Sequence, residues 1–199
     1  MSAYALLSVL LQYPSAETDP ADGDVLREVE RLPRGAAHDG IAAFLAARKD
    51  TLLAAAQAEY VETFDFDRRA SLYLTYHSHG DRRQRGIELV RLKRRFHEAG
   101  LVLADGELPD YLPALLEFAA LVPAADGEAL LAELRPQLEL VRSRLHERGS
   151  PYAHLLDAVV TGLPPLTRAQ AERARRLAEE GPPTELVGLD SPPVPEPVA

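Results

Sequence analysis

Along most of this chain, apolar residues recur at spacings of three and four positions, the pattern of amphipathic helices. Strand-like composition occurs only over residues 71–79, where propensity alone leaves strand and helix open. An isolated strand of that length would have no pairing partner, so we interpret the segment as a helix. The pattern therefore predicts an all-α protein.

The helices expected from this pattern are separated by breaks that contain proline and glycine. They cover residues 1–13, 25–32, 41–47, 50–64, 71–79, 82–99, 111–121, 131–145, 152–161 and 167–180. Gly35–Gly40 is interpreted as a break, and Asp81 and Asp110 are interpreted as N-caps. Pro136 should either kink the helix over 131–145 or begin a second one.

We expect one globular helical domain over residues 1–180, followed by a tail over residues 181–199. A chain of 199 residues is long enough to bury a core without disulfides or metals. The tail holds six prolines and shows no apolar periodicity, which predicts disorder.

Charge and composition narrow the functional classes. The absence of cysteine excludes disulfides, thiolate catalysis and iron–sulfur ligation. A net charge of −9 argues against binding of nucleic acid or anionic membranes and favours a basic partner. No apolar segment approaches the roughly 20 residues of a membrane span, and Met1–Tyr13 lacks the features of a signal peptide. We therefore expect a cytoplasmic protein with no membrane insertion.

Patterns of catalytic or metal-binding chemistry are scarce. No histidine has an acid three positions before it, so the Glu-x-x-His signature of di-metal helical bundles is absent. His77, His79 and Asp81 could ligate one metal, but a polar capping role at a helix end is the more common arrangement. Nucleophile elbows and glycine-rich phosphate loops are also absent. We expect no enzyme activity, no metal, no cofactor and no stable small-molecule ligand.

The predicted helix that begins at Arg82 is basic. Residues 81–98 hold seven arginines and lysines against three acids. The simpler interpretation is a solvated helix face that balances acids elsewhere in the protein. The competing hypothesis is a nucleotide-binding helical switch that contacts phosphates through this helix, and a third is a scaffold subunit of a stable complex.

Two clusters combine acids with aromatic residues. The first lies within Glu59–Asp65 and the second within Asp105–Glu117, and neither contains a basic residue. If they meet in space, they would frame an apolar groove with acidic rims, which suits an amphipathic peptide helix that carries lysine or arginine. The alternative is that the aromatic residues belong to the core and the acids are merely solvated.

Several segments together resemble a known family. They are Tyr60-Val-Glu-Thr-Phe-Asp65, Ser71-Leu-Tyr-Leu-Thr-Tyr76, Gly80-Asp81, Arg85-Gly86 and Glu107-Leu-Pro-Asp-Tyr-Leu-Pro-Ala-Leu-Leu-Glu-Phe118. In order and spacing they are similar to the respiratory nitrate reductase assembly chaperones, the NarJ or delta-subunit family. These belong to the wider group of TorD-like and DmsD-like redox-enzyme maturation chaperones. The resemblance covers roughly residues 3–163.

This resemblance implies an all-α chaperone of the TorD-like type that performs no chemistry. Its implied partner is the apo form of the catalytic α subunit of nitrate reductase, bound through its N-terminal segment. The chaperone would hold this apoenzyme competent for insertion of the molybdenum cofactor before membrane attachment. Chaperoning of another molybdoenzyme of the same group is the alternative.

The resemblance also implies peptide-binding residues in three of these segments, 60–65, 71–76 and 107–118. We expect Glu107 and Asp110 to face the partner. The expected peptide-binding set is Tyr60, Glu62, Phe64, Asp65, Tyr73, Tyr76, Glu107, Pro109, Asp110, Tyr111, Leu112, Leu115 and Leu116. Tyr111 stands where the wider group often has histidine, and this departure puts in doubt any nucleotide-linked role of the turn.

Overall fold

The computed structural model describes residues 1–16, 23–80 and 83–183. This part of the chain forms eleven α-helices and one π-helical turn, η1. The elements are α1 Ala3–Leu10, α2 Gly23–Glu30, α3 Ala36–Arg48, α4 Leu53–Tyr60, η1 Val61–Asp65, α5 Leu74–His79, α6 Arg83–Glu98, α7 Leu112–Leu121, α8 Ala124–Glu133, α9 Arg135–Glu147, α10 Tyr152–Thr161 and α11 Arg168–Glu180.

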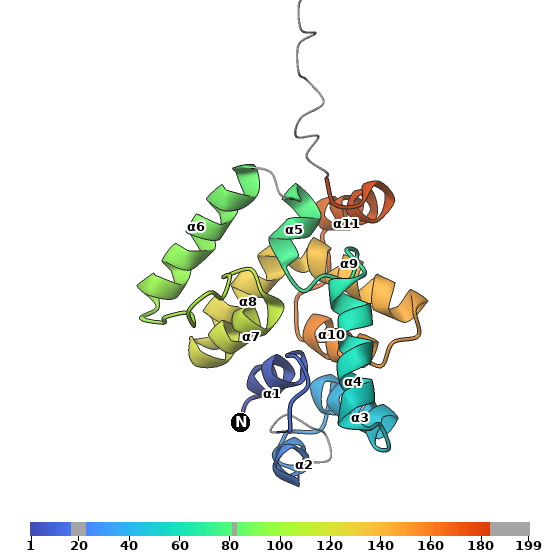
Figure 1. Cartoon of the computed structure of the whole chain (residues 1–199). Helices are drawn as coiled ribbons and strands as arrows, with labels where there is room; N and C mark the ends of the chain where they lie inside the picture. The colour runs from blue at the N-terminus through green and yellow to red at the C-terminus, as the bar shows by residue number, and fades with distance from the viewer. Residues whose placement is uncertain (17–22, 81–82, 184–199) are drawn as a thin grey trace, which may run out of the picture.

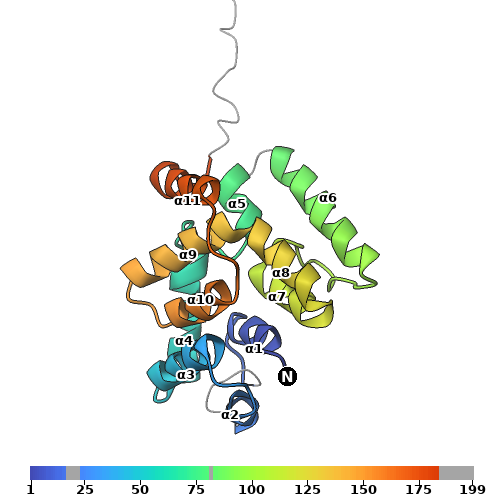
Figure 2. The same ribbon diagram turned by 180° about the vertical axis from the view of Figure 1, so that it is seen from behind.

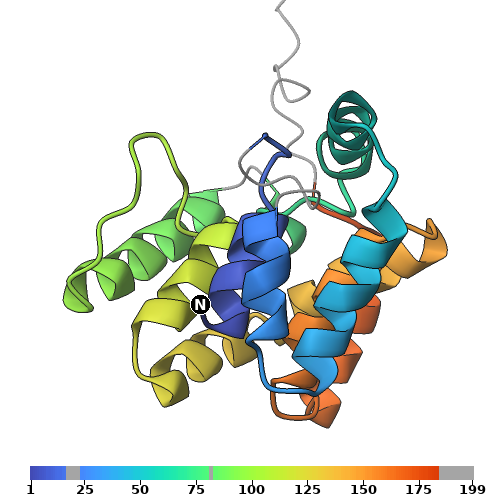
Figure 3. The ribbon, with the colours of Figure 1, turned by 90° about the horizontal axis from the view of Figure 1, so that it is seen from below.

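The core is built around α10 and α7. α10 packs against α3 and α9, while α7 packs against α1 and α8. Tyr152, Leu155, Leu112 and Leu115 on these two helices are fully buried. α6 lies along the outer edge of the molecule and α11 lies beside α9, as both side views show (Figures 1 and 2). The loop that joins α6 to α7 stands away from the helices when the molecule is seen from below (Figure 3).

The structure confirms the all-α fold and the single helical domain. The expected helix over 152–161 coincides with α10, and Thr167 caps α11 through a capping box with Gln170. Pro136 lies in the first turn of α9, so it begins a second helix. Asp81 and residues 184–199, which include most of the expected tail, lie outside the described residues.

The predicted break at 35–40 is wrong, because α3 begins at Ala36 and continues through Gly40. This glycine is needed for packing and not for a turn. A Cβ atom at Gly40 would lie 2.6 Å from the carbonyl oxygen of His154 and 2.9 Å from the Cβ of Ala158. Gly40 therefore allows α3 to approach α10 closely.

The segment over 71–79 combines the two conformations that its composition suggests. Tyr73 forms an isolated antiparallel bridge with Tyr111, and α5 begins at the next residue. The prediction of a helix is confirmed from Leu74 onward, while Tyr73 before it is extended. None of the described helices has both the length and the apolar character needed to cross a membrane.

Candidate functional site

The segments Ser71–Tyr76 and Glu107–Phe118, both identified in the sequence, meet through this bridge. The backbone N–H of Leu74 donates to the carbonyl oxygen of Asp110 at 3.0 Å, and the N–H of Leu112 donates to that of Leu72 at 2.8 Å. The rings of Tyr73 and Tyr111 lie with their centroids 5.1 Å apart. Residues separated by about forty positions therefore form one local structure.

Tyr60 joins the first acidic–aromatic cluster to the second. Its hydroxyl donates to the carbonyl oxygen of Leu11 at 3.2 Å and lies 3.0 Å from the hydroxyl of Tyr111. Its ring packs against Phe64 at 4.8 Å and against Tyr13 at 5.5 Å. Burial raises the pKa of Tyr60 above the usual range and that of Tyr111 to about 12. Both phenols are therefore neutral at physiological pH.

Asp110 does not have the position expected from the sequence. Its side chain is fully buried, and its Oδ2 accepts hydrogen bonds from the Thr75 N–H at 3.2 Å, the Thr75 hydroxyl at 2.5 Å and Arg85 Nη2 at 3.3 Å. The N-cap of α7 is Tyr111, without a side-chain cap. The expectations that Asp110 caps this helix and faces a partner are both wrong, because its carboxylate anchors α5 and α6 to the turn.

The other predicted binding residues divide between the interior and the surface. Pro109, Leu112, Leu115 and Leu116 are buried in the core, so in this conformation they support the turn and α7 from within. Glu62 is exposed and lies 3.4 Å from Arg148. Whether these residues contact a peptide stays a prediction.

A small hollow is lined by several other members of the predicted peptide-binding set. Four members of that set line it together with three further residues, and its volume is about 200 Å³. The four are Phe64, Asp65, Tyr73 and Tyr76, and the others are Arg68, Ser71 and Arg85. The guanidinium of Arg85 lies 5.9 Å from the ring centroid of Tyr73 and 5.7 Å from that of Tyr76. Tyr73 lines this hollow, whereas its bridge partner Tyr111 lines a larger groove.

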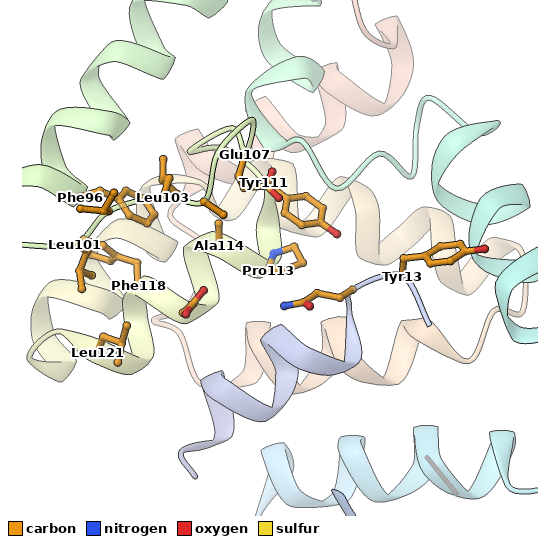
Figure 4. Close-up of a pocket in the computed structure, with 14 residues that line it drawn as sticks. Tyr13, Phe96, Leu101, Leu103, Glu107, Tyr111, Pro113, Ala114, Phe118 and Leu121 are labelled. Carbon is orange, nitrogen blue, oxygen red and sulfur yellow. The ribbon is translucent and has the colours of Figure 1, made fainter. Parts of the chain in front are cut away.

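The larger groove has a volume of about 430 Å³ and lies between the end of α1, the α6–α7 loop and α7. Its lining residues are Gln12, Tyr13, Phe96, Leu101, Val102, Leu103, Ala104, Glu107, Tyr111, Pro113, Ala114, Glu117, Phe118 and Leu121. Figure 4 shows Phe96, Leu101, Phe118 and Leu121 gathered at one end and Tyr13 at the other. We call this site the α7 groove.

The α7 groove is apolar at its base and acidic at its rim. Among the described residues that line it, the charged ones are Glu107 and Glu117. Val102 and Leu121 are 94% and 62% exposed, so large apolar side chains remain open to a partner. Glu107 and Tyr111 are the two members of the predicted set that line this groove.

Sequence reasoning missed most of the groove wall. Tyr13, Phe96 and Leu103 come from three different segments whose approach depends on tertiary packing. The available signal was the apolar loop Leu101-Val-Leu103, which follows the Gly100 helix stop and has no helical periodicity of its own.

His77 and His79 both lie in α5, and the surroundings of His77 indicate a structural role. His77 is fully buried, its Nε2 lies 2.8 Å from the carbonyl oxygen of Ser71, and burial lowers its pKa to about 4. Among the described residues, no group of three or more side chains is arranged to hold a metal ion, and Asp81 lies outside them.

The basic helix α6 is partly neutralised within the fold. Arg91 and Arg95 both pair with Glu133 of α8, at 2.9 and 2.6 Å. Arg85 pairs with the buried Asp110 at 3.3 Å. Three of its arginines thus have internal partners, which favours a structural role over phosphate binding.

Comparisons with known proteins agree on one family. The sequence model of the family described as nitrate reductase delta subunit matches residues 30–158. The chain is 35% identical over 163 residues to the probable nitrate reductase molybdenum cofactor assembly chaperone NarJ of Bacillus subtilis, a match covering 80% of this chain and 87% of that one. NarJ of Escherichia coli K12 is also 35% identical over 163 residues, covering 80% and 69%. The nitrate reductase-like protein NarX of Mycobacterium tuberculosis is 37% identical over 154 residues, which are 76% of this chain but only 23% of NarX.

Proposed function

Because the chain belongs to the nitrate reductase delta subunit family of assembly chaperones, we propose that it binds the catalytic α subunit of respiratory nitrate reductase through that subunit's N-terminal segment. It holds the apoenzyme competent for insertion of the molybdenum cofactor before membrane attachment. The two NarJ relatives are named as assembly chaperones and not as catalysts, which agrees with the expectation that the chain is not an enzyme.

The observation that carries the proposal is the combination of an apolar floor and an acidic rim in the α7 groove. Val102 and Leu121, which are 94% and 62% exposed, offer apolar surface, while Glu107 and Glu117 offer negative charge without a basic neighbour in the lining. An amphipathic helix with arginine or lysine on its polar side complements both features. Burial of the apolar face supplies affinity, and the carboxylates orient the helix and favour its encounter with the protein.

We infer that the other predicted residues act at two levels. Tyr60 holds Tyr13 and Tyr111, which are groove residues, through ring packing and a hydroxyl contact of 3.0 Å. Asp110 fixes the turn that presents Glu107. Asp65, Tyr73 and Tyr76 extend the binding surface beyond the groove if the bound segment continues past Tyr111.

A binding titration with a synthetic peptide of the α-subunit N-terminal segment tests this proposal. We expect Glu107→Lys/Glu117→Lys to weaken binding about tenfold or more, since two attractive contacts become repulsive, each pair contributing up to about 1 kcal/mol. Leu121→Asp should weaken it comparably by placing a charge against the apolar face. Circular dichroism should stay helical, because Glu117 and Leu121 are exposed.

Glu180→Lys is the matched control, since it makes the same charge change on α11, away from the groove. It should bind like the wild type at moderate salt. Unchanged affinity in both groove variants would show that the peptide binds elsewhere.

A further inference from the structure

The end of α3 and the side of α4 lie near the turn between α9 and α10 (Figure 1). A second hollow of about 480 Å³, separate from the α7 groove, lies between these segments. Its lining residues are Ala47, Arg48, Thr51, Glu59, His146, Gly149, Ser150, Pro151, Ala153 and His154. None of them belongs to the predicted peptide-binding set. We call it the α10 hollow, because it opens over the N-terminal end of that helix.

Arg48 is a buried cation at the α10 hollow. It is only 4% exposed, and its guanidinium lies 4.6 Å from the ring centroid of Tyr152 and 5.2 Å from that of Phe44. Its Nη2 donates to Glu59 at 3.0 Å, whereas its buried Nε has no partner. A buried charged donor without an acceptor is costly, so a ligand that supplied one would be bound favourably.

Ser150 supplies a second unused donor. Its hydroxyl is buried and has no partner, and the residue immediately precedes Pro151, the N-cap of α10. Here the backbone carbonyl of Ser150 accepts from the Ala153 N–H at 3.0 Å, and the hydroxyl makes no capping bond. The positive end of the helix dipole adds a field that favours an anion.

We propose that the α10 hollow binds a small oxyanion, of the phosphate or carboxylate class, through Arg48 and Ser150 at the N-terminus of α10. His154 also lines this hollow. Glu59 is the internal competitor, because its carboxylate already accepts from the Arg48 guanidinium and repels a second anion. This site is independent of the proposed peptide groove.

Because Glu59 competes with a bound anion for Arg48, substitutions at this site should change the anion affinity in opposite directions. Removing the negative charge with Glu59→Gln should strengthen oxyanion binding, whereas Ser150→Ala should weaken it about tenfold, as expected for loss of a hydrogen bond to a charged group. If these residues served packing alone, neither substitution would change anion affinity. Ser143→Ala is the matched control, because Ser143 is exposed on α9 and does not line the hollow.

Calorimetric titration of the full chain with inorganic phosphate, and separately with acetate, tests the proposal against chloride at equal ionic strength. We expect saturable binding below about 10 mM for at least one of the two anions, and the better binder identifies phosphate or carboxylate as the class. The order of affinity should be Glu59→Gln, then wild type and Ser143→Ala, then Ser150→Ala. Absence of saturable binding to either anion would overturn the proposal, as would equal affinity in Ser150→Ala and the wild type.

Discussion

His77 is a buried imidazole whose two nitrogens have different surroundings. Nε2 lies 2.8 Å from the carbonyl oxygen of Ser71, which assigns the proton to this nitrogen, and Nδ1 has no partner. Burial is the main cause that lowers its pKa from 6.5 to about 4. The folded protein therefore keeps this ring neutral over a range in which the unfolded chain protonates it.

The free energy of unfolding should depend on pH through His77. Because its pKa is lower in the folded state, the stabilising contribution is complete above pH 6.5 and is lost as the pH falls from 6.5 toward 4. At pH 5 the loss is about 2 kcal/mol. Urea unfolding of the wild type and of His77→Gln at pH 7 and pH 5 measures this loss in the free energy of unfolding.

For each protein, the quantity to compare is the change in the free energy of unfolding between pH 7 and pH 5. His77→Gln is a suitable reference because its glutamine side chain keeps an N–H donor and does not titrate. The wild type should lose about 2 kcal/mol more than His77→Gln on acidification, while all other titrating groups cancel. Equal losses in the two proteins would contradict the assigned state of His77.

Asp110 shows where residue-scale prediction from the sequence ends. The short sequence Leu-Pro-Asp-Tyr before an apolar helix favours an N-cap, which is a local interaction. In the structure, the carboxylate instead accepts hydrogen bonds from Thr75 and Arg85, which are 35 and 25 positions away in the sequence. No local rule identifies such distant partners, and their choice reverses the expected orientation of this side chain from the surface to the interior.

At the scale of elements, helix periodicity was sufficient where one face of a helix meets the core. α10 could be placed from its apolar spacing, whereas α11, which contains no buried residue, could be placed from its capping residue Thr167. Periodicity failed at Gly40, because a glycine in a helix and a glycine in a turn look the same in the sequence. The α7 groove could not be predicted from the sequence for a related reason, since its wall joins the end of α1 to a loop without periodicity.

The close approach of α3 and α10 should make Gly40→Ala destabilising. Alanine favours a helix by about 1 kcal/mol over glycine, but the new Cβ would lie 2.6 Å from the backbone oxygen of His154. Separation of the two helices should cost more than the propensity gain, for a net loss of about 1–2 kcal/mol. Chemical denaturation measures the change.

Gly86→Ala in α6 is the control for helix propensity. A Cβ there has no neighbour within 4 Å, so alanine should stabilise the protein by about 0.5–1 kcal/mol. Stabilisation by both substitutions would contradict the tight helix–helix contact at Gly40.

At the scale of the whole molecule, the charges are unevenly distributed. The chain carries a net charge of −9, yet α6 is strongly basic. Arg85, Arg91 and Arg95 of this helix have acidic partners within the fold, while Glu107 and Glu117 at the α7 groove have no basic neighbour in the lining. The excess negative charge thus remains available at the groove, where it favours the approach of a basic segment.

α11 contributes little to the core of the protein. It follows the matched family region of residues 30–158 and contains no buried residue. Its tertiary hydrogen bonds include Gln170 Nε2 to the carbonyl oxygen of Ala132 at 2.9 Å and Arg173 Nη2 to the Ser78 hydroxyl at 3.2 Å. Because it lines neither the α7 groove nor the α10 hollow, its loss should leave both sites intact.

Truncation after Leu166 should therefore lower the free energy of unfolding by only about 1–3 kcal/mol, the contribution expected of a few partly exposed hydrogen bonds. Thermal and urea unfolding should remain cooperative, and the affinity for the α-subunit peptide should match that of the full chain. The truncation keeps Pro164, whose carbonyl oxygen accepts from Arg135 Nη1 at 3.1 Å, so the α9 surface retains that contact. A non-cooperative transition, or peptide binding weakened about tenfold, would instead make α11 part of the functional structure.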